Sequence, residues 1–320
     1  MMNVPQASLD AARILEQRSA YRECPGLAAV YVRGDDRTTW LNGQITNDVR
    51  EIAQGQSVHA LAVNVRGKIL AELFVADLGE ALILLVHKSA EAALLESFER
   101  YIIMEDVTLE PMNQLRVLSL EGPDSPALHK LITCGAEVVG FAHSSLELPA
   151  YGWIGSAGEL EIIREQLSAH APAIDEPAHE LARLRRATPR FGIDFDEHHY
   201  PQEAGLKAYV SFNKGCYLGQ EVVCTLESRG RLSRHLVRLR GEPGARFEPG
   251  AGLTLANAED QPDPVGTLTS ATWDPELGAS LALGYVRRMH AAPGTRLLAG
   301  MQALTIDKHV GETVSEREKA

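Results

Sequence analysis

The chain has 320 residues, of which 45% are hydrophobic and 23% are charged, and its formal net charge is −12. This is an ordinary globular composition, and the length allows one large domain or two to three small ones. An acidic chain is a poor match for a protein that wraps duplex nucleic acid by neutralising phosphates, so we expect no nucleic-acid partner. No apolar run is long enough to span a bilayer, and residues 1–20 lack the apolar core of a signal peptide. We therefore expect a cytoplasmic protein with no membrane partner.

The cysteines are Cys24, Cys134, Cys216 and Cys224, and they form no Cys-x-x-Cys pair. No histidine stands at zinc-finger spacing from them. The sequence predicts a reduced protein with no disulfide framework, no structural metal and no iron–sulfur cluster of its own.

The first part of the chain predicts a short polar helix from about Ser8, followed by a mixed strand and helix unit. A strand at 28–33 leads through a Gly-Asp-Asp turn into a helix that contains Leu41 and Ile45. A strand at 81–86 and a helix at 90–101 complete this unit.

The second part repeats this order. A strand at 115–120 leads through a Gly-Pro-Asp turn into a helix expected to hold Leu128, Leu131 and Ile132. Strands at 152–154 and 159–163 and a helix near 178–187 follow. Two such units predict a duplicated α+β sheet, although strand–glycine–helix is common in any α/β protein.

The segment Lys214-Gly215-Cys216-Tyr217-Leu218-Gly219-Gln220-Glu221 is dense in reactive side chains. A strand is expected at 209–212 and a helix from about Leu218 to about Gly230, which places Cys216 in the first turn of that helix. A helix N-terminus and the nearby Lys214 favour a thiolate. The alternative is a small, buried and inert cysteine, and local chemistry leaves the two open.

After residue 230 the chain holds short apolar alternations separated by glycine and proline clusters. They predict the short strands of a small barrel or sandwich. The charged tail at 312–320 is expected to be disordered.

Other polar residues have both a local and a functional interpretation. Asn42 and Gln44 lie in a polar run that also fits helix caps and turns. Arg66 flanks Gly67 and fits either an exposed hairpin tip or a contact with a carboxylate ligand. Glu203 fits a loop glutamate or an acceptor for N–H groups of a ligand. The adjacent histidines at 198 and 199 are interpreted as a surface loop.

The octapeptide at 214–221 resembles the signature of the YgfZ-type folate-binding proteins, relatives of the glycine-cleavage T-protein (aminomethyltransferase). Other landmarks resemble the same family in the same order. They are Leu-Asn-Gly-Gln-Ile-Thr-Asn-Asp-Val at 41–49, Asn-Val-Arg-Gly-Lys-Ile-Leu at 64–70, Thr-Pro-Arg-Phe-Gly-Ile-Asp at 188–194 and Pro-Gln-Glu-Ala-Gly-Leu at 201–206.

The resemblance implies an α+β fold of duplicated ferredoxin-like subdomains with a C-terminal small β-barrel, arranged as a three-domain ring. The implied organisation is an N-terminal segment 1–24, a first subdomain 25–110, a second subdomain 111–235 with the signature, a barrel 236–311 and a tail 312–320.

The resemblance also implies a ligand, tetrahydrofolate or a derivative, in a central hole between the subdomains, with Cys216 near it. Cys216 and Lys214 would be the catalytic pair. The residues expected to bind folate are Asn42, Gln44, Asn64, Arg66, Glu203, Tyr217, Gln220, Glu221 and Arg229.

The implied function is support for the assembly or repair of iron–sulfur enzymes, with those enzymes or assembly factors as protein partners. The alternatives are a tetrahydrofolate-dependent aminomethyltransferase-like enzyme and a non-catalytic adaptor on the same fold.

The sequence departs from the family in three places. Arg185-Arg186-Ala187 stands where relatives often carry Glu-Ala-Gly, whose glutamate lies near the folate. Thr225 stands where an arginine often follows the signature. The catalytic aspartate of the T-protein has no counterpart that can be assigned.

Overall fold

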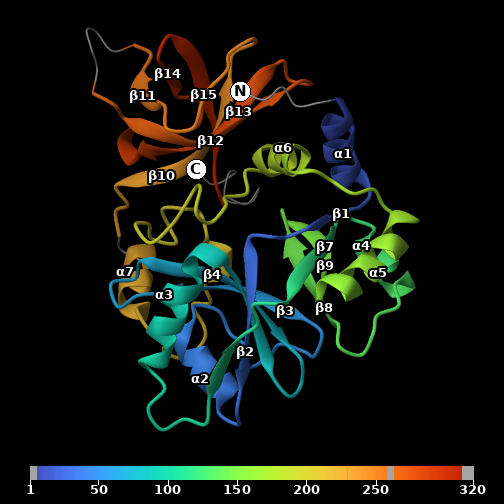
Figure 1. Ribbon diagram of the computed structural model, residues 1–320. Coiled ribbons are helices and arrows are strands. Elements are labelled where there is room, and N and C mark those ends of the chain that lie inside the picture. Colours follow the sequence, from blue (N-terminus) through green and yellow to red (C-terminus); the bar gives the residue numbers. More distant parts are fainter. Residues whose placement is uncertain (1–5, 229, 258–262, 312–320) are drawn as a thin grey trace. The chain divides into compact units, whose positions relative to one another are not determined.

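The computed structural model describes residues 6–228, 230–257 and 263–311 (Figure 1). These residues form two compact units. The two-sheet unit comprises Arg13–Asp175 and Tyr209–Val222, and the barrel unit comprises the remainder. The division of the chain into five segments, expected from the sequence, remains a prediction. Residues 1–5 and 312–320, at the two ends of that division, lie outside the described residues.

The larger sheet of the two-sheet unit is antiparallel, with strand order β3-β4-β5-β2-β6. Helix α3 packs against β4 and β5, where its buried residues Ala90, Leu94 and Phe98 recur at helical spacing. The elements are β2 (Leu27–Arg33), α2 (Arg37–Gln44), β3 (Ser57–Val63), β4 (Ile69–Asp77), β5 (Leu82–His87), α3 (Lys88–Glu99) and β6 (Thr108–Pro111).

The second sheet of this unit is also antiparallel, with order β1-β7-β9-β8. Leu160, Ile163 and Leu167 of α5 pack with Trp153 of β9. Residues of both sheets, among them Ile83, Phe141 and Ile154, share a buried cluster between them. The elements are β1 (Ala20–Glu23), β7 (Arg116–Glu121), α4 (Ser125–Leu128), the 3₁₀ turn η1 (His129–Leu131), β8 (Val139–Ser145), β9 (Leu148–Gly155) and α5 (Ala157–Ser168).

Two sequence predictions in this region are wrong. The expected strand at 159–163 lies inside α5, because Ser156 and Glu159 form a capping box that starts a helix. The expected helix through Ile132 is only a four-residue helix followed by η1, and the chain turns extended at Ile132.

A half-buried histidine lies among aromatic rings of the two sheets. The His143 ring lies 5.6 Å from that of Phe74 and 5.5 Å from that of Phe141, and its Nε2 is 3.2 Å from Ser119 Oγ. Burial lowers the pKa of His143 to about 4, against a smaller raising effect of Glu121. This ring is therefore neutral at pH 7.

We expect His143 to make the protein less stable as the pH falls from about 6.5 towards 4. Because the folded-state pKa is the lower one, the unfolded chain binds more protons in that window. Between pH 7 and pH 5, wild type should lose about 2 kcal/mol more unfolding free energy than His143→Phe. Urea unfolding at both pH values measures this difference. The exposed His170→Asn variant is the control, and an equal pH dependence of wild type and His143→Phe would contradict the prediction.

The barrel unit is built on a closed barrel with strand order β10-β13-β12-β11-β14-β15, drawn in orange and red in Figure 1. Alternating inward residues such as Val237, Leu239 and Leu253 fill its interior. The elements are α6 (Glu176–Arg186), η2 (Lys207–Tyr209), β10 (Arg234–Gly241), β11 (Gly252–Leu255), β12 (Gly266–Asp274), β13 (Ala279–Arg287), η3 (Arg288–His290), β14 (Arg296–Ala299) and β15 (Gln302–His309). Helices α1 (Gln6–Gln17) and α7 (Gln220–Ser228) pass from one unit to the other.

The prediction of an α+β fold with a C-terminal β-barrel is confirmed. Among the described residues, no helix is both long and apolar enough to cross a membrane.

Helix α6 is joined to the barrel by a buried ion pair. Arg183 and Asp194 are both only 1% exposed. Nη1 of Arg183 donates to Asp194 Oδ2 at 2.5 Å, and Nη2 donates to Ser270 Oγ at 2.7 Å. Asp194 Oδ1 accepts from the hydroxyls of Thr269 and Ser270 on β12. Such a network is expected to hold α6 in one position on the barrel wall.

Candidate functional site

Three motifs that are far apart in the sequence meet in the two-sheet unit. They are the α2-to-β3 connection at 41–49, the β3–β4 hairpin tip at 64–68 and the signature segment at 214–221. The Leu218 N–H donates to the carbonyl of Gly43 at 3.1 Å. Gly219 has φ +77°, and a Cβ added there would lie 2.4 Å from the carbonyl oxygen of Asn64. This position therefore requires glycine both for its backbone conformation and for close approach to the hairpin.

Lys214 binds the signature segment to the end of α2. Its side chain is buried, and Nζ donates to the carbonyls of Asn42 at 2.6 Å, Ile45 at 2.8 Å and Asn47 at 2.8 Å. The carbonyls at a helix C-terminus lack intrahelical donors, and this ammonium supplies three. Burial lowers the pKa of Lys214 to about 8, while Asp48 acts to raise it. The geometry gives Lys214 a positioning role, since all three N–H groups are engaged.

Asp48 is itself held as a carboxylate. Hydrogen bonds from the side chain of Arg50 lower its pKa to about 2, against a raising effect of burial. Arg50 Nε and Nη2 donate to the two carboxylate oxygens at 3.0 and 2.6 Å. The α2-to-β3 connection therefore keeps a fixed negative charge near the Lys214 ammonium.

The approach to the signature is an irregular segment, so the strand expected at 209–212 is wrong. Its backbone bonds go to one residue of the α2-to-β3 connection. The Thr46 hydroxyl donates to the carbonyl of Tyr209 at 2.7 Å, and the Ser211 N–H donates to the carbonyl of Thr46 at 2.9 Å. Thr46 thus satisfies, with its hydroxyl and its carbonyl, backbone groups of this segment that a neighbouring strand would otherwise pair with.

Cys216 is exposed, and it stands between two buried residues, Lys214 and Tyr217. The prediction that it lies in the first turn of a helix is wrong, because α7 begins at Gln220. The left-handed Gly219 stops the helix from extending towards the cysteine. The thiol is therefore presented on a short loop anchored at both sides, and the buried alternative is excluded.

Two of the predicted ligand residues have their side-chain oxygens occupied by the backbone. Asn42 Oδ1 accepts from the Val49 N–H at 3.2 Å. Asn64 Oδ1 accepts from the N–H groups of Arg66 and Lys68 at 2.9 and 3.2 Å, which shapes the hairpin tip. These asparagines build the turns on which the site stands.

The side chains of Gln44 and Arg66 still have groups available to contact a ligand. Gln44 lies between Gly43 and Ile45, whose carbonyls accept from the signature segment. Its Oε1 is buried and has no hydrogen-bond partner among the described residues. Arg66 is exposed at the hairpin tip, and within the described part of the chain its guanidinium has no ion pair or hydrogen bond. One acceptor and one cation are thus available beside the signature segment.

The remaining residues of the signature surround the cysteine loop. Tyr217 is buried, with the Lys214 ammonium 5.3 Å from its ring centroid. Gln220 Oε1 accepts from the Tyr217 N–H at 3.4 Å, and Glu221 is exposed in the first turn of α7. No three metal-ligating side chains within the described ranges are placed to hold a metal ion.

Glu203 and Arg185 belong to the barrel unit and are engaged there. The buried carboxylate of Glu203 accepts from the Tyr200 N–H at 3.2 Å and from Ser233 Oγ and Arg234 Nε at 3.4 Å each. Arg185 donates to both carboxylate oxygens of Asp274 at 2.8 and 2.9 Å. Arg229 lies outside the described residues.

Two family models match the chain. The GCVT N-terminal domain matches residues 7–146, and the glycine cleavage T-protein C-terminal barrel domain matches residues 234–314. The second match covers all strands of the closed barrel. The chain belongs to the glycine cleavage T-protein family.

The relatives of this family member fall under two names, tRNA-modifying protein YgfZ and aminomethyltransferase. A tRNA-modifying protein YgfZ of Vibrio vulnificus is 28% identical over 240 residues, which are 73% of this chain and 72% of the relative. An aminomethyltransferase of Halothermothrix orenii is 26% identical over 314 residues, 88% of this chain and 85% of the relative. The crystal structure of an aminomethyltransferase T from Bartonella henselae superposes with a TM-score of 0.81 at 18% identity, covering 94% of this chain and 88% of that one. The expected resemblance to YgfZ and T-protein relatives is confirmed.

Sequence reasoning missed the residues that hold the signature segment in place. The roles of Gly43 and Thr46 depend on the carbonyl of one and the hydroxyl of the other contacting a segment about 170 residues away. The nearest available signal was their membership of a motif that resembles the family.

Proposed function

We propose that this protein binds tetrahydrofolate or a derivative and supports the assembly or repair of iron–sulfur enzymes through the thiol of Cys216. One observation carries the proposal. An exposed thiol is held between two buried anchors by contacts from the other family motifs. The duplicated ferredoxin-like subdomains and the ring arrangement implied by the resemblance are part of this proposal.

The available groups fit a folate. A pterin ring carries N–H donors, and an acceptor for them is Gln44 Oε1, which has no hydrogen-bond partner within the described residues. The glutamate tail carries carboxylates, for which the Arg66 guanidinium is a bidentate partner. Asn42, Asn64 and Lys214 act by positioning these two residues and the cysteine loop. Bound tetrahydrofolate would supply a carrier for one-carbon units, and iron–sulfur enzymes or their assembly factors are the proposed protein partners.

A matched pair of cysteine variants tests the role of the thiol. Cys216→Ser and Cys134→Ser each remove one exposed thiol with little change in volume. In cells that lack the native gene, Cys216→Ser should leave iron–sulfur enzyme activity at the level of the deletion strain. Cys134→Ser should restore it fully. Full restoration by Cys216→Ser would overturn the proposed role of the thiol.

The second candidate is a tetrahydrofolate-dependent aminomethyltransferase-like enzyme. It is favoured by the aminomethyltransferase relative that spans 88% of this chain. Glycine-cleavage activity with a lipoyl-bearing carrier protein would support it. Capture of a protein partner without folate binding and without a need for Cys216 would instead support the adaptor.

A further inference from the structure

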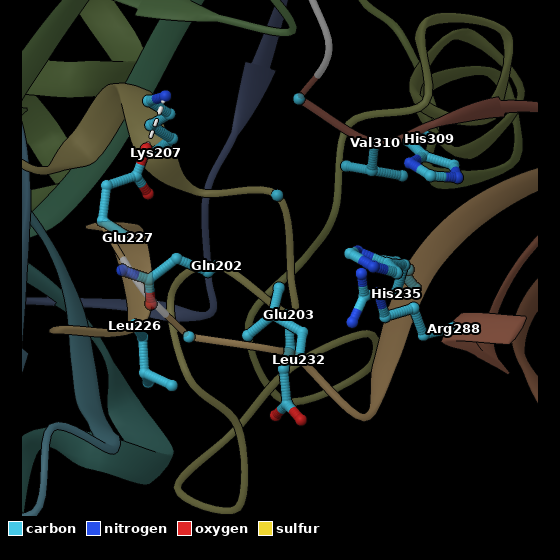
Figure 2. Close-up of a pocket in the computed structure, with 14 residues that line it drawn as sticks. Gln202, Glu203, Lys207, Leu226, Glu227, Leu232, His235, Arg288, His309 and Val310 are labelled. Atoms are coloured by element: carbon cyan, nitrogen blue, oxygen red, sulfur yellow. Dashed lines mark ion pairs between the residues drawn. The ribbon is translucent and has the colours of Figure 1, made fainter. Parts of the chain in front are cut away.

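A pocket of about 490 Å³ lies within the barrel unit, and this volume is typical of small-molecule sites (Figure 2). Its walls come from residues 202–207, 226–227 and 230–236, from Arg288 of η3 and from residues 309–311 at the end of β15. In Figure 2 the side chains of His235, Arg288 and His309 lie together on one side, and the Lys207–Glu227 ion pair lies on the other.

The acidic groups of this pocket are already neutralised. Glu227 pairs with Lys207 at 2.6 Å. Glu203 pairs with Arg234 at 3.4 Å, and its carboxylate points away from both imidazoles in Figure 2. Arg288 differs, because its guanidinium has no ion pair or hydrogen bond in the part of the chain that the structure describes. The pocket is therefore locally cationic, although the chain carries a net charge of −12.

Barrel pairing places two imidazoles beside Arg288. His235 is the second residue of β10 and His309 is the last of β15. These strands pair in the barrel, and the two rings are stacked 5.0 Å apart at 13°. His309 Nε2 lies 2.7 Å from the carbonyl of Ala291, which can only accept, so Nε2 is the protonated nitrogen. Apolar wall residues Leu226, Leu232 and Leu236 complete the lining.

We propose that this pocket binds an organic phosphate monoester. The Arg288 guanidinium and the His235 imidazole contact the phosphate, and the leucines contact the organic part. A dianion suits a guanidinium beside an N–H-bearing ring, and an arginine fork matches the geometry of phosphate oxygens. His309, whose Nε2–H donates to the Ala291 carbonyl, stacks on the His235 ring and positions it. A second concavity, lined by Ser233, Arg287, Arg288 and Met289, shares Arg288 with the pocket. This inference goes beyond the proposed function and does not depend on it.

Calorimetric titration of the full chain with phenyl phosphate tests the proposal. Wild type should bind saturably, and Arg288→Met should bind at least about 10-fold more weakly. The control is Arg240→Met, which removes an exposed arginine of the same unit that lines neither concavity. This variant should bind phenyl phosphate with the wild-type affinity. His235→Phe keeps a ring beside His309 but removes two nitrogens, and should also weaken binding.

Three results would overturn the proposal. The first is the absence of binding to folded wild type up to about 10 mM phenyl phosphate, which is weaker than a specific site allows. The second is an equal loss in Arg288→Met and Arg240→Met, which would indicate unspecific charge attraction. The third is binding of benzoate as tight as that of phenyl phosphate, which would exclude selection of a dianion. Folate binding at the signature segment is measured in its own titration with tetrahydrofolate. Failure of the phosphate proposal therefore does not imply failure of the folate proposal, or the reverse.

Discussion

Lys214→Met is expected to lower the free energy of unfolding by about 3 kcal/mol. The substitution leaves the carbonyls of Asn42, Ile45 and Asn47 without their donor. Each buried carbonyl without a partner costs about 1–3 kcal/mol, and the relief from burying a charged amine offsets part of the sum. Urea unfolding measures the loss.

The cysteine loop should loosen in the same variant. We expect faster proteolysis and faster amide hydrogen exchange at 211–218, because the anchor on one side of Cys216 is gone. Lys88→Met, at an exposed lysine of the same unit, is the control and should change stability by at most about 0.5 kcal/mol. Equal behaviour of the two variants would contradict the positioning role of Lys214.

Asp194→Asn is expected to cost about 3–5 kcal/mol of unfolding free energy in the barrel unit. The change removes one of the two carboxylates that neutralise the buried Arg183, the other being Glu180, and disturbs the bonds from Thr269 and Ser270. Breaking a buried ion pair costs more than the pair contributes, because the remaining charge stays desolvated. Trp273, in β12 beside these residues in sequence, reports the unfolding of this unit by fluorescence.

The control for this variant is Glu242→Gln. Glu242 pairs with Arg296 at the surface, where both side chains are more than half exposed. Exposed pairs contribute about 1 kcal/mol or less. A cost of Asp194→Asn no larger than that of Glu242→Gln would show that the buried network is not needed for stability.

Local sequence patterns predicted the elements whose apolar spacing is regular. The strands around Ile83 and Leu283 and the helix that contains Leu94 are of this kind. Prediction failed where a polar contact overrides the spacing. The apolar residues of 159–163 also fit a strand, and the Ser156–Glu159 capping box decides for a helix.

The candidate site was predictable as a set of motifs but not as a geometry. The order of the motifs indicated that they act together. Nothing local showed that Lys214 donates to a carbonyl of α2 and to two that follow it, or that Gly219 contacts Asn64. Helix prediction from apolar spacing also placed Cys216 in a helical turn. It could not foresee that Gly219, which lies against Asn64, adopts a left-handed conformation and delays the helix start to Gln220. The pocket at His235 and His309 depends on barrel pairing between distant strands, which periodicity does not reveal.

Titration of the purified protein with tetrahydrofolate, followed by tryptophan fluorescence, tests the central proposal most directly. Trp40 lies in α2, four residues before Gln44, and its indole N–H donates to the carbonyl of Tyr101 at 2.9 Å. We predict saturable quenching in wild type and in Arg100→Met, and about 10-fold weaker binding in Arg66→Met. The absence of any saturable change in folded wild-type protein would contradict folate binding, and the adaptor would then become the leading function.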